Sequence, residues 1–328
     1  MFLGKNLVKI VVLGTGGTIA GEGHDPKNRP EHDRAYTAAQ RPVAALMQGV
    51  TLPAGAEIVT EQVAQLDSKD MDHATWRQLL ARCRHWLAQE VAGIVITHGT
   101  DTLEETAFFL SQTLPANKPV VLTCAMRPAT SQEADGPQNL TDALRLVLEP
   151  QARGVLVVCA GQAHGALEVQ KVHASRLNAF ASASGPIALC ANGAWVWQVI
   201  PSSSQDQPGE DAIETRAQAC LTKQDWPRVE VVLSHAGATA AVVDALLSAS
   251  GATPLRGLVV AATGNLTVQA SLQKSLERAA QQGVAVCLAS RCVWGGAVPV
   301  GVQPGTPGSE LSPLKARIAL MLDLMQAG

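Results

Sequence analysis

Short runs of β-branched and other apolar residues recur along the chain, each bounded by glycine, proline or a polar turn. The first four are VKIVVLG at 8–14, GIVIT at 93–97, PVVLTC at 119–124 and GVLVVCA at 154–160. Such runs are typical of strands buried on both faces, as in a parallel sheet. Between them lie segments with helical spacing, such as DTLEETAFFL, in which Leu103, Ala107 and Leu110 share one face. Because strand and helix alternate, the sequence predicts an α/β fold.

The alternation breaks between residues 198 and 227, where PSSSQDQPGEDA supplies serine, proline, glycine and acid without an apolar period. Strand-like runs resume beyond it as VEVVLS, GLVVAA and GVAVCLA. We therefore expect three parts. Residues 1–197 form a larger N-terminal domain with a mostly parallel sheet flanked by helices, residues 198–227 form a linker, and residues 228–328 form a smaller C-terminal α/β domain.

Charge and hydropathy exclude several classes of protein. The 328 residues carry a formal net charge of -3 and contain no long block of Lys or Arg, which argues against nucleic acid or an anionic membrane as partner. No apolar stretch reaches the roughly 18 residues of a membrane span. The N-terminal segment lacks the pattern of a signal peptide, and the seven cysteines form no C-x-x-C pair. We expect buried free thiols, a cytoplasmic location and a small polar ligand.

The run VVLGTGGTIAG at 11–21 places three glycines after the first predicted strand. A dinucleotide fingerprint needs a third glycine where Ile19 stands, and a P-loop needs G-K-[ST], so binding of a phosphate is disfavoured. What remains is a turn at the carboxyl end of a strand, where open α/β sheets bind their ligands, presenting Thr15 and Thr18. The alternative for Thr18 is a helix N-cap.

A second stretch, GIVITHGTDTLEETAFFL, again runs from a strand through glycine, threonine and acid into a helix. Thr100 and Asp101 are predicted at the N-terminus of that helix. The alternative is structural, because Asp101 followed by Glu104 is a good capping pattern. Two threonine-bearing turns at one edge of a sheet would converge, however, and hydroxyls, a carboxylate and helix N–H groups are what acyl transfer requires.

These stretches resemble the asparaginase/glutaminase amidohydrolase family of bacterial-type L-asparaginases. GTGGTIAG and ITHGTDTLEETAFFL are similar to its first two signatures, and AMRPATSQEADGPQNL, GPIALCANG and SPLKARIAL are similar to further segments. The resemblance covers almost the whole chain. It implies hydrolysis of L-asparagine to L-aspartate and ammonia without a metal or cofactor, through an acyl-threonine intermediate.

The resemblance also implies catalytic roles. Thr18 would be the nucleophile, and Tyr36, the single tyrosine of the chain, would stand at the end of a mobile loop, residues 21–35, and take the proton of Thr18. Thr100 would be the second hydroxyl, backed by Lys171 and its acidic companion Asp101. Whether Lys171 accepts a proton or acts electrostatically stays open.

The same resemblance implies how the substrate is held. Asp101 would bind the ammonium of the amino acid and Ser68 its carboxylate, while the backbone of Thr100 and of Ala125 would lie near the amide and its developing oxyanion. His98 matches the family, and a structural hydrogen bond is the role we expect for it.

The chain departs from the family in two places. Lys69 stands beside Ser68 where many members have glutamine, and either pairs with the substrate carboxylate or points to solvent. The acidic residue that the family lends from a neighbouring subunit's C-terminal domain is missing, because SRCVWGGAVPVGVQPGTPGSELSP has no acid before Glu310.

The resemblance implies a homotetramer with sites at subunit interfaces. A mixed glutaminase-asparaginase and a non-catalytic amino-acid sensor remain alternatives; a nicotinamide-binding dehydrogenase is disfavoured by Ile19.

Overall fold

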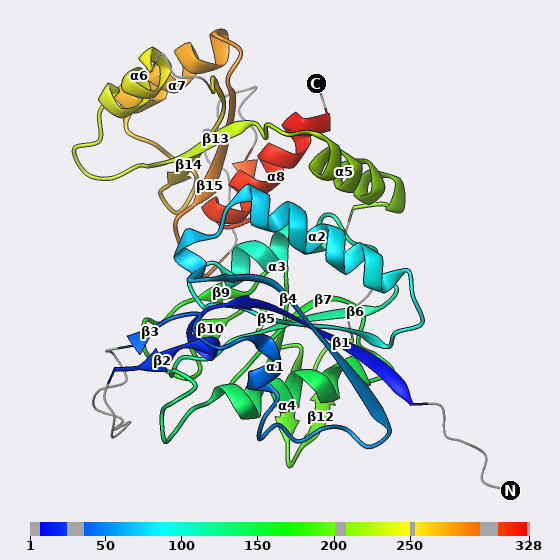
Figure 1. Ribbon diagram of the computed structural model, residues 1–328. Helices are drawn as coiled ribbons and strands as arrows, with labels where there is room; N and C mark the ends of the chain where they lie inside the picture. The colour runs from blue at the N-terminus through cyan, green and yellow to red at the C-terminus, as the bar shows by residue number, and fades with distance from the viewer. Residues whose placement is uncertain (1–6, 25–35, 201–207, 250–252, 296–307, 327–328) are drawn as a thin grey trace, which may run out of the picture. The chain divides into compact units, whose positions relative to one another are not determined.

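The computed structural model describes residues 7–24, 36–200, 208–249, 253–295 and 308–326. The chain divides into two compact units, Met1–Ile213 and Glu214–Gly328. Each unit contains its own mostly parallel sheet with helices packed against it (Figure 1). The predicted α/β class, with a larger N-terminal and a smaller C-terminal sheet, is confirmed.

The first unit is built on an eight-stranded sheet. Its strands lie in the order β12 (Ala194–Trp197), β11 (Ala188–Ala191), β8 (Gln162–Gly165), β7 (Gly154–Cys159), β6 (Pro119–Thr123), β5 (Gly93–Thr97), β1 (Val8–Gly16) and β4 (Ala56–Leu66). The pairs from β4 to β7 are parallel, and those from β7 to β12 are antiparallel. Every residue of β5, β6 and β7 is buried, as continuous apolar runs require.

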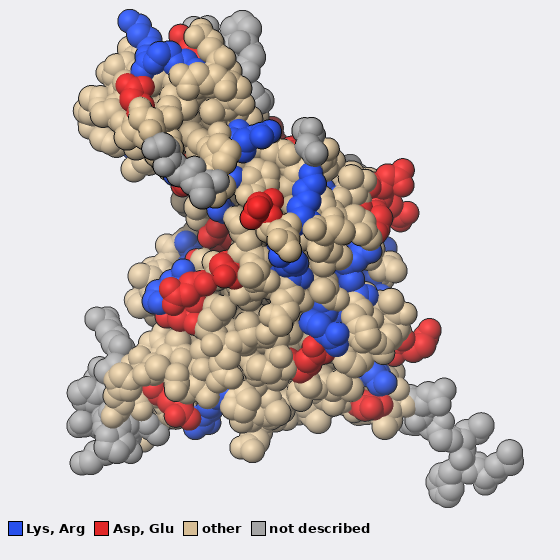
Figure 2. Space-filling model, turned by 45° about the horizontal axis from the view of Figure 1, so that its top comes forward, with Lys and Arg blue, Asp and Glu red and all other residues tan. Residues whose placement is uncertain are grey.

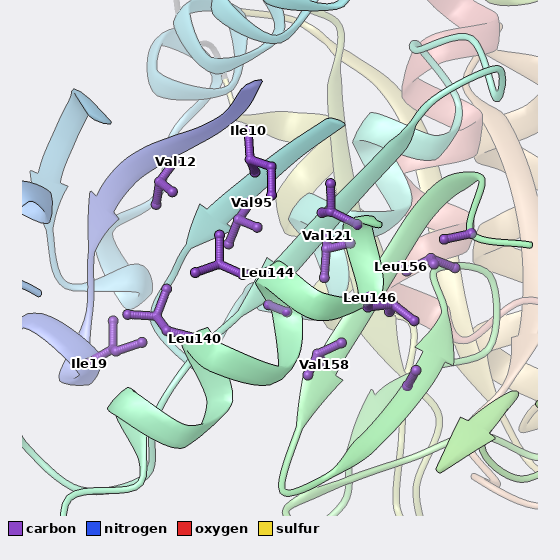
Figure 3. Packing of buried hydrophobic residues seen from close by; sticks show 14 of the residues in the cluster. Ile10, Val12, Ile19, Val95, Val121, Leu140, Leu144, Leu146, Leu156 and Val158 are labelled. Atoms are coloured by element: carbon purple, nitrogen blue, oxygen red, sulfur yellow. The ribbon is translucent and has the colours of Figure 1, made fainter. Parts of the chain in front are cut away.

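Helices cover both faces of this sheet (Figure 1). They are α1 (Val43–Leu46), α2 (His73–Leu87), α3 (Leu103–Ser111) and α4 (Gly136–Val147). On the α4 face, Leu140 and Leu144 pack with Ile10, Val95 and Val121 of three neighbouring strands (Figure 3). Ile19, the residue after Thr18, belongs to the same cluster. The turn after β1 is therefore anchored in the core of the unit by an apolar side chain.

Several very short elements extend from the sheet. They are η1 (Thr18–Ala20), the two-stranded pair β2 (Glu22–Gly23) and β3 (Tyr36–Thr37), η3 (Ser68–Asp70), and the two-stranded pair β9 (Gln170–Lys171) and β10 (Phe180–Ala181). These elements carry most of the predicted site residues. Thr100 and Asp101 lie between β5 and α3, beyond the carboxyl end of β5.

The second unit is a four-stranded parallel sheet in the order β13 (Arg228–Leu233), β14 (Leu255–Ala262), β15 (Ala285–Ser290) and β16 (Gly308–Ser309). Its helices are α6 (Ala241–Ser248), α7 (Ala270–Gln281) and α8 (Pro313–Gln326). Val243 of α6 and Leu272 and Leu276 of α7 form an apolar core with Leu258 and Val260 of β14.

The expected linker, residues 198–227, contains the helix α5 (Glu210–Thr222). Its apolar face is narrow: Ile213, Ala217 and Cys220 are buried at i, i+4 and i+7, and the other residues of the helix are polar or charged except for Ala212, Ala219 and Leu221. This apolar period is too weak to predict a helix here from the sequence. The boundary between the two units falls inside α5. The domain limits drawn from the sequence stay a prediction.

On the face in Figure 2, Lys and Arg side chains are interspersed with Asp and Glu. Among the described residues, no helix combines the length and apolar character that crossing a bilayer would take. All seven cysteines lie in described residues, and none of them forms a disulfide.

Candidate active site

The first threonine corner follows β1. The chain leaves the strand through Gly16 and Gly17, which have φ angles of 105° and 81° that favour glycine. Thr18 then opens the 3₁₀ turn η1 and is buried. Its Oγ1 lies 2.7 Å from the hydroxyl of Tyr36, close enough for a hydrogen bond in which either oxygen donates. The structure thus brings together the predicted nucleophile and the predicted acceptor of its proton.

Tyr36 reaches Thr18 because Gly21 has no side chain. A Cβ on Gly21 would lie 2.8 Å from Cδ2 of the Tyr36 ring. The backbone of Tyr36 is held by pairing of β3 with β2, and the N–H of Gly23 donates to Oγ1 of Thr130 at 2.7 Å. Most of the expected mobile loop, residues 25–35, lies outside the described residues.

The second threonine corner follows β5. Thr100 is buried, and its Oγ1 accepts a hydrogen bond of 2.8 Å from Nζ of Lys171. The same ammonium lies 2.6 Å from Oδ1 of Asp101. The Asp101 side chain is 54% exposed, so one part of this carboxylate stays open to a ligand. Thr100, Asp101 and Lys171, predicted as one group, therefore do form one.

The two corners touch through their glycines. A Cβ on Gly17 would lie 2.3 Å from Cα of Gly99, and a Cβ on Gly99 would lie 2.4 Å from Oγ of Ser68. No side chain fits at either position without displacing backbone or Ser68. Thr18 and Thr100 directly follow Gly17 and Gly99, so the two hydroxyls belong to adjoining segments, as the convergence argument predicts.

Ser68 is bonded to the second corner. It is buried, its Oγ accepts from the N–H of Asp101 at 3.2 Å, and its carbonyl oxygen accepts from Oγ1 of Thr102 at 2.7 Å. The predicted carboxylate-binding serine thus lies against the predicted ammonium-binding Asp101. An α-amino acid carries both of these charged groups on one carbon, so a single molecule could reach both side chains.

Ala125 lies in the loop after β6, which is held from two sides. The carboxylate of Asp135 accepts from the N–H groups of Met126 and Arg127 at 2.9 and 3.0 Å, and Nδ2 of Asn139 donates to the carbonyl of Cys124 at 2.9 Å. A Cβ on Gly136 would lie 3.0 Å from Cγ1 of Ile19 and 3.5 Å from Cβ of Ala125. The loop is therefore placed beside the first corner.

Two sequence-predicted residues lie in other settings. Lys69 is 61% exposed and forms an ion pair with Asp70, whose hydrogen bond raises the pKa of Lys69. This pairing fits the solvent-facing alternative for Lys69. Thr15, grouped with Thr18 from the sequence, is buried in the sheet and donates to the carbonyl of Thr97 at 2.9 Å, so its hydroxyl is occupied within the fold.

His98 is fully buried beside the second corner. Its Nδ1 lies 2.7 Å from the carbonyl oxygen of Gly99 and its Nε2 lies 3.0 Å from Oγ1 of Thr106. Burial lowers the pKa of His98 to about 4, because a charged imidazolium would lose its hydration. A neutral imidazole bonded at both nitrogens fits the expected structural role.

The sequence alone does not mark Glu104 as a residue of the site. Its capping pattern with Asp101 is not formed: the N-cap of α3 is Thr102, without a side-chain cap bond, and Asp101 pairs with Lys171 instead. The carboxylate of Glu104 is buried and accepts a hydrogen bond from the backbone N–H of Lys171. The available signal was a second acid in the first turn of a helix that begins at the site. Among the described residues, no cluster of three His, Cys, Asp or Glu side chains could hold a metal ion.

Two family models match the chain. The model "Asparaginase, N-terminal" covers residues 9–201, and "Glutaminase/Asparaginase C-terminal domain" covers residues 228–327. Together they span both units. The chain belongs to the asparaginase family.

Named relatives agree with this assignment over nearly full length. The chain is 34% identical to "L-asparaginase 2" of Escherichia coli, over 98% of this chain and 90% of that protein. It is 32% identical to "Glutaminase-asparaginase" of Pseudomonas fluorescens, over 97% and 86%. Among solved structures, "Crystal Structure of Probable Cytoplasmic L-asparaginase from Campylobacter jejuni" matches with a TM-score of 0.85 and 30% identity, covering 98% of each chain.

Proposed function

We propose that this protein hydrolyses the side-chain amide of L-asparagine to give L-aspartate and ammonia, through an acyl-Thr18 intermediate. Membership of the asparaginase family supports the reaction. The observation that carries the mechanism is the 2.7 Å contact between Thr18 Oγ1 and the Tyr36 hydroxyl, beside the Thr100, Lys171 and Asp101 group.

In the first half-reaction, Thr18 Oγ1 attacks the amide carbon while its proton passes to the Tyr36 oxygen, and the phenolic proton of Tyr36 moves on to the amide nitrogen. An unassisted threonine hydroxyl is a weak nucleophile, and a positioned acceptor for its proton corrects this. The tetrahedral oxyanion forms near the backbone of Ala125. Collapse of this intermediate breaks the C–N bond, and the nitrogen that received the proton from Tyr36 departs as ammonia. An ester between Thr18 and the aspartyl group is left.

In the second half-reaction, water attacks the ester carbon and Thr18 is released as its free hydroxyl. Thr100, with Lys171 behind it, is the group suited to orient this water or the amide. Lys171 acts either by accepting a proton or by stabilising negative charge. Asp101 binds the substrate ammonium and Ser68 its carboxylate, so selection of an α-amino acid depends on the second corner.

Ammonia release tests this proposal. Purified protein is assayed with L-asparagine and L-glutamine side by side, together with Thr18→Ala and Thr18→Val. We expect asparagine turnover by the wild type and a loss of about 10⁴-fold in both variants, because each removes the nucleophile. Turnover that survives in Thr18→Val would refute an acyl-Thr18 intermediate. Tight binding of aspartate by a wild type without turnover would favour the sensor instead.

A mixed glutaminase-asparaginase is the second candidate. It is favoured by the Pseudomonas relative whose name carries both activities. A ratio of kcat/KM for glutamine over asparagine near one would establish it. A ratio below about 0.01 would exclude it.

Assembly and compartment complete the proposal. We propose a homotetramer, and light scattering after size-exclusion chromatography measures its mass. We propose the cytoplasm, because the Campylobacter jejuni structure that the chain resembles is named a probable cytoplasmic L-asparaginase. Cell fractionation with an antibody checks this location.

A further inference from the structure

Glu104 has a buried carboxylate that contacts Lys171 of the second corner. It lies in the first turn of α3 and is 6% exposed, although carboxylates are seldom buried without partners. One of its oxygens, Oε2, accepts the backbone N–H of Lys171. The catalytic roles derived above leave this carboxylate without a function.

The hydrogen bond to Glu104 holds a segment that has little backbone pairing of its own. Lys171 stands on β9, a strand of two residues that, within the described parts of the chain, pairs only with the two residues of β10. The following N–H groups, those of Val172 and His173, both donate to the carbonyl oxygen of Ala179. The N–H of Lys171 itself donates to the carboxylate of Glu104. Pairing of β9 with β10 therefore does not by itself fix the backbone of Lys171.

Residues 100–104 thus hold Lys171 at both ends. Thr100 and Asp101 contact its ammonium at 2.8 and 2.6 Å, and Glu104 bonds its backbone N–H. Thr100 and Asp101 lie just before α3 and Glu104 lies in its first turn, so the two attachment points keep a constant separation. A lysine side chain has four rotatable bonds, and fixing both ends removes most of its freedom.

We propose that Glu104 is a positioning residue that fixes the Lys171 ammonium against Thr100 and Asp101. This inference rests on the proposed hydrolysis at the same site. Glu104 acts through the length of its side chain and its hydrogen bond to Lys171 rather than through its charge. Misplacement of a reacting group by about 1 Å can cost about 100-fold in rate, whereas substrate contacts made by Ser68 and Asp101 are left in place.

Three variants distinguish the effect of the length of the Glu104 side chain from the effect of its charge. Glu104→Ala removes the acceptor, Glu104→Asp keeps the charge but shortens the side chain, and Glu104→Gln keeps a carbonyl acceptor of full length without the charge. We expect kcat to fall about 10- to 100-fold in the alanine and aspartate variants with KM within about threefold. The glutamine variant should stay within about threefold of the wild type. A glutamine variant as damaged as alanine would overturn the proposal.

Glu168→Ala is the matched control, because Glu168 also accepts a backbone N–H, that of Ser184, at 2.9 Å. It should leave kcat unchanged. In a Lys171→Met background, Glu104→Asp should cause no further loss, since a residue acting through Lys171 has nothing left to position. An additional tenfold loss there would overturn the proposal.

A readout independent of turnover completes the test. In protein labelled with ¹³C-lysine, the Cε resonance of Lys171 is assigned by its absence from Lys171→Met. We expect this resonance to move toward those of solvent-exposed lysines in Glu104→Ala and Glu104→Asp and to stay in Glu104→Gln, while the other lysine resonances are unchanged. An unmoved resonance would refute positioning. A wild type without ammonia release would instead refute the proposed function and leave this result to decide the role of Glu104.

Discussion

The two threonine corners are built alike and partnered differently. Each follows a parallel strand, turns through glycine and buries its threonine. Thr18 meets a neutral hydroxyl from a two-residue strand, whereas Thr100 meets an ammonium that also pairs with a carboxylate. In the proposed mechanism, this difference divides the work of the site: the first corner supplies a hydroxyl whose proton can leave, and the second supplies fixed charge for the substrate and its transition state.

Among the variants that compare the two corners through the partners of their threonines, the largest expected effect tests the charge of the second corner. Lys171→Met keeps the length of the side chain but removes the ammonium, so we expect kcat for asparagine to fall about 1000-fold. Steady-state ammonia release measures it. Lys118→Met is the control, because Lys118 donates to carbonyl oxygens of Leu87 and Gln89; its kcat should match the wild type. A Lys171→Met enzyme within threefold of the wild type would remove the distinction between the corners.

The next effect tests the neutral partner of the first corner. Tyr36→Phe deletes the hydroxyl that contacts Thr18 Oγ1 and leaves the ring. We expect kcat to fall about 100-fold, because the proton of Thr18 loses its acceptor, while KM changes little. Rapid-quench measurement of the acyl-enzyme checks that acylation is the step slowed. Normal acylation would show that another group takes the proton.

A third prediction concerns acid stability of the second corner. The pKa of His98 is about 4 in the folded protein and about 6.5 when unfolded. The unfolded state therefore binds the extra proton first, and stability falls as pH drops from about 6.5 toward 4. Urea unfolding at pH 7 and 4.5 should show a decrease that is about 2 kcal/mol larger in wild type than in His98→Gln. Equal decreases would mean that His98 is protonated in the fold.

A smaller effect tests how the Tyr36 ring is placed. Gly21 has φ -82° and ψ 153°, which alanine adopts readily, but its Cβ would lie 2.8 Å from the Tyr36 ring. We expect Gly21→Ala to fold normally and lose about tenfold in kcat. Gly165→Ala is the control, since a Cβ there meets nothing within 4 Å. Equal activity of the two variants would show that the ring adjusts freely.

The smallest effect concerns Lys69 at the rim of the second corner. Its ion pair with Asp70 and its exposure lead us to expect less than a threefold change in the glutamine-to-asparagine ratio of kcat/KM in Lys69→Gln. Competition assays with both amides measure the ratio. A tenfold shift would place Lys69 on the substrate.

Much of this arrangement could be predicted from the sequence because strand ends in parallel sheets share an edge. The apolar runs predict β1, β5, β6 and β7, and the glycine turns after β1 and β5 point to Thr18 and Thr100. Lys171 was assigned only through family resemblance, because it lies some 70 residues from Thr100 on a two-residue strand. A strand of two residues is too short to show a periodic pattern of apolar residues in the sequence.

Other features of the structure could not be predicted from the sequence, for physical reasons. Glu104 fits a capping pattern, and sequence alone does not reveal that a distant backbone N–H competes for its carboxylate. Thr15 and Thr18 stand three residues apart, but Thr15 still belongs to β1 and its hydroxyl donates to the carbonyl of Thr97 in the sheet. Helix α5 buries only one narrow face, which leaves too little apolar periodicity to detect.

The contact between Gly17 and Gly99 links turnover to strand register at the centre of the large sheet. β1 pairs with β5 from Ile10 opposite Gly93 to Gly14 opposite Thr97. A slip of one residue would shift the two corners by about 3.3 Å and exchange the faces of every side chain on one strand. During refolding, ammonia release should therefore return only when this pairing is native, so recovery of activity would report on register rather than on collapse.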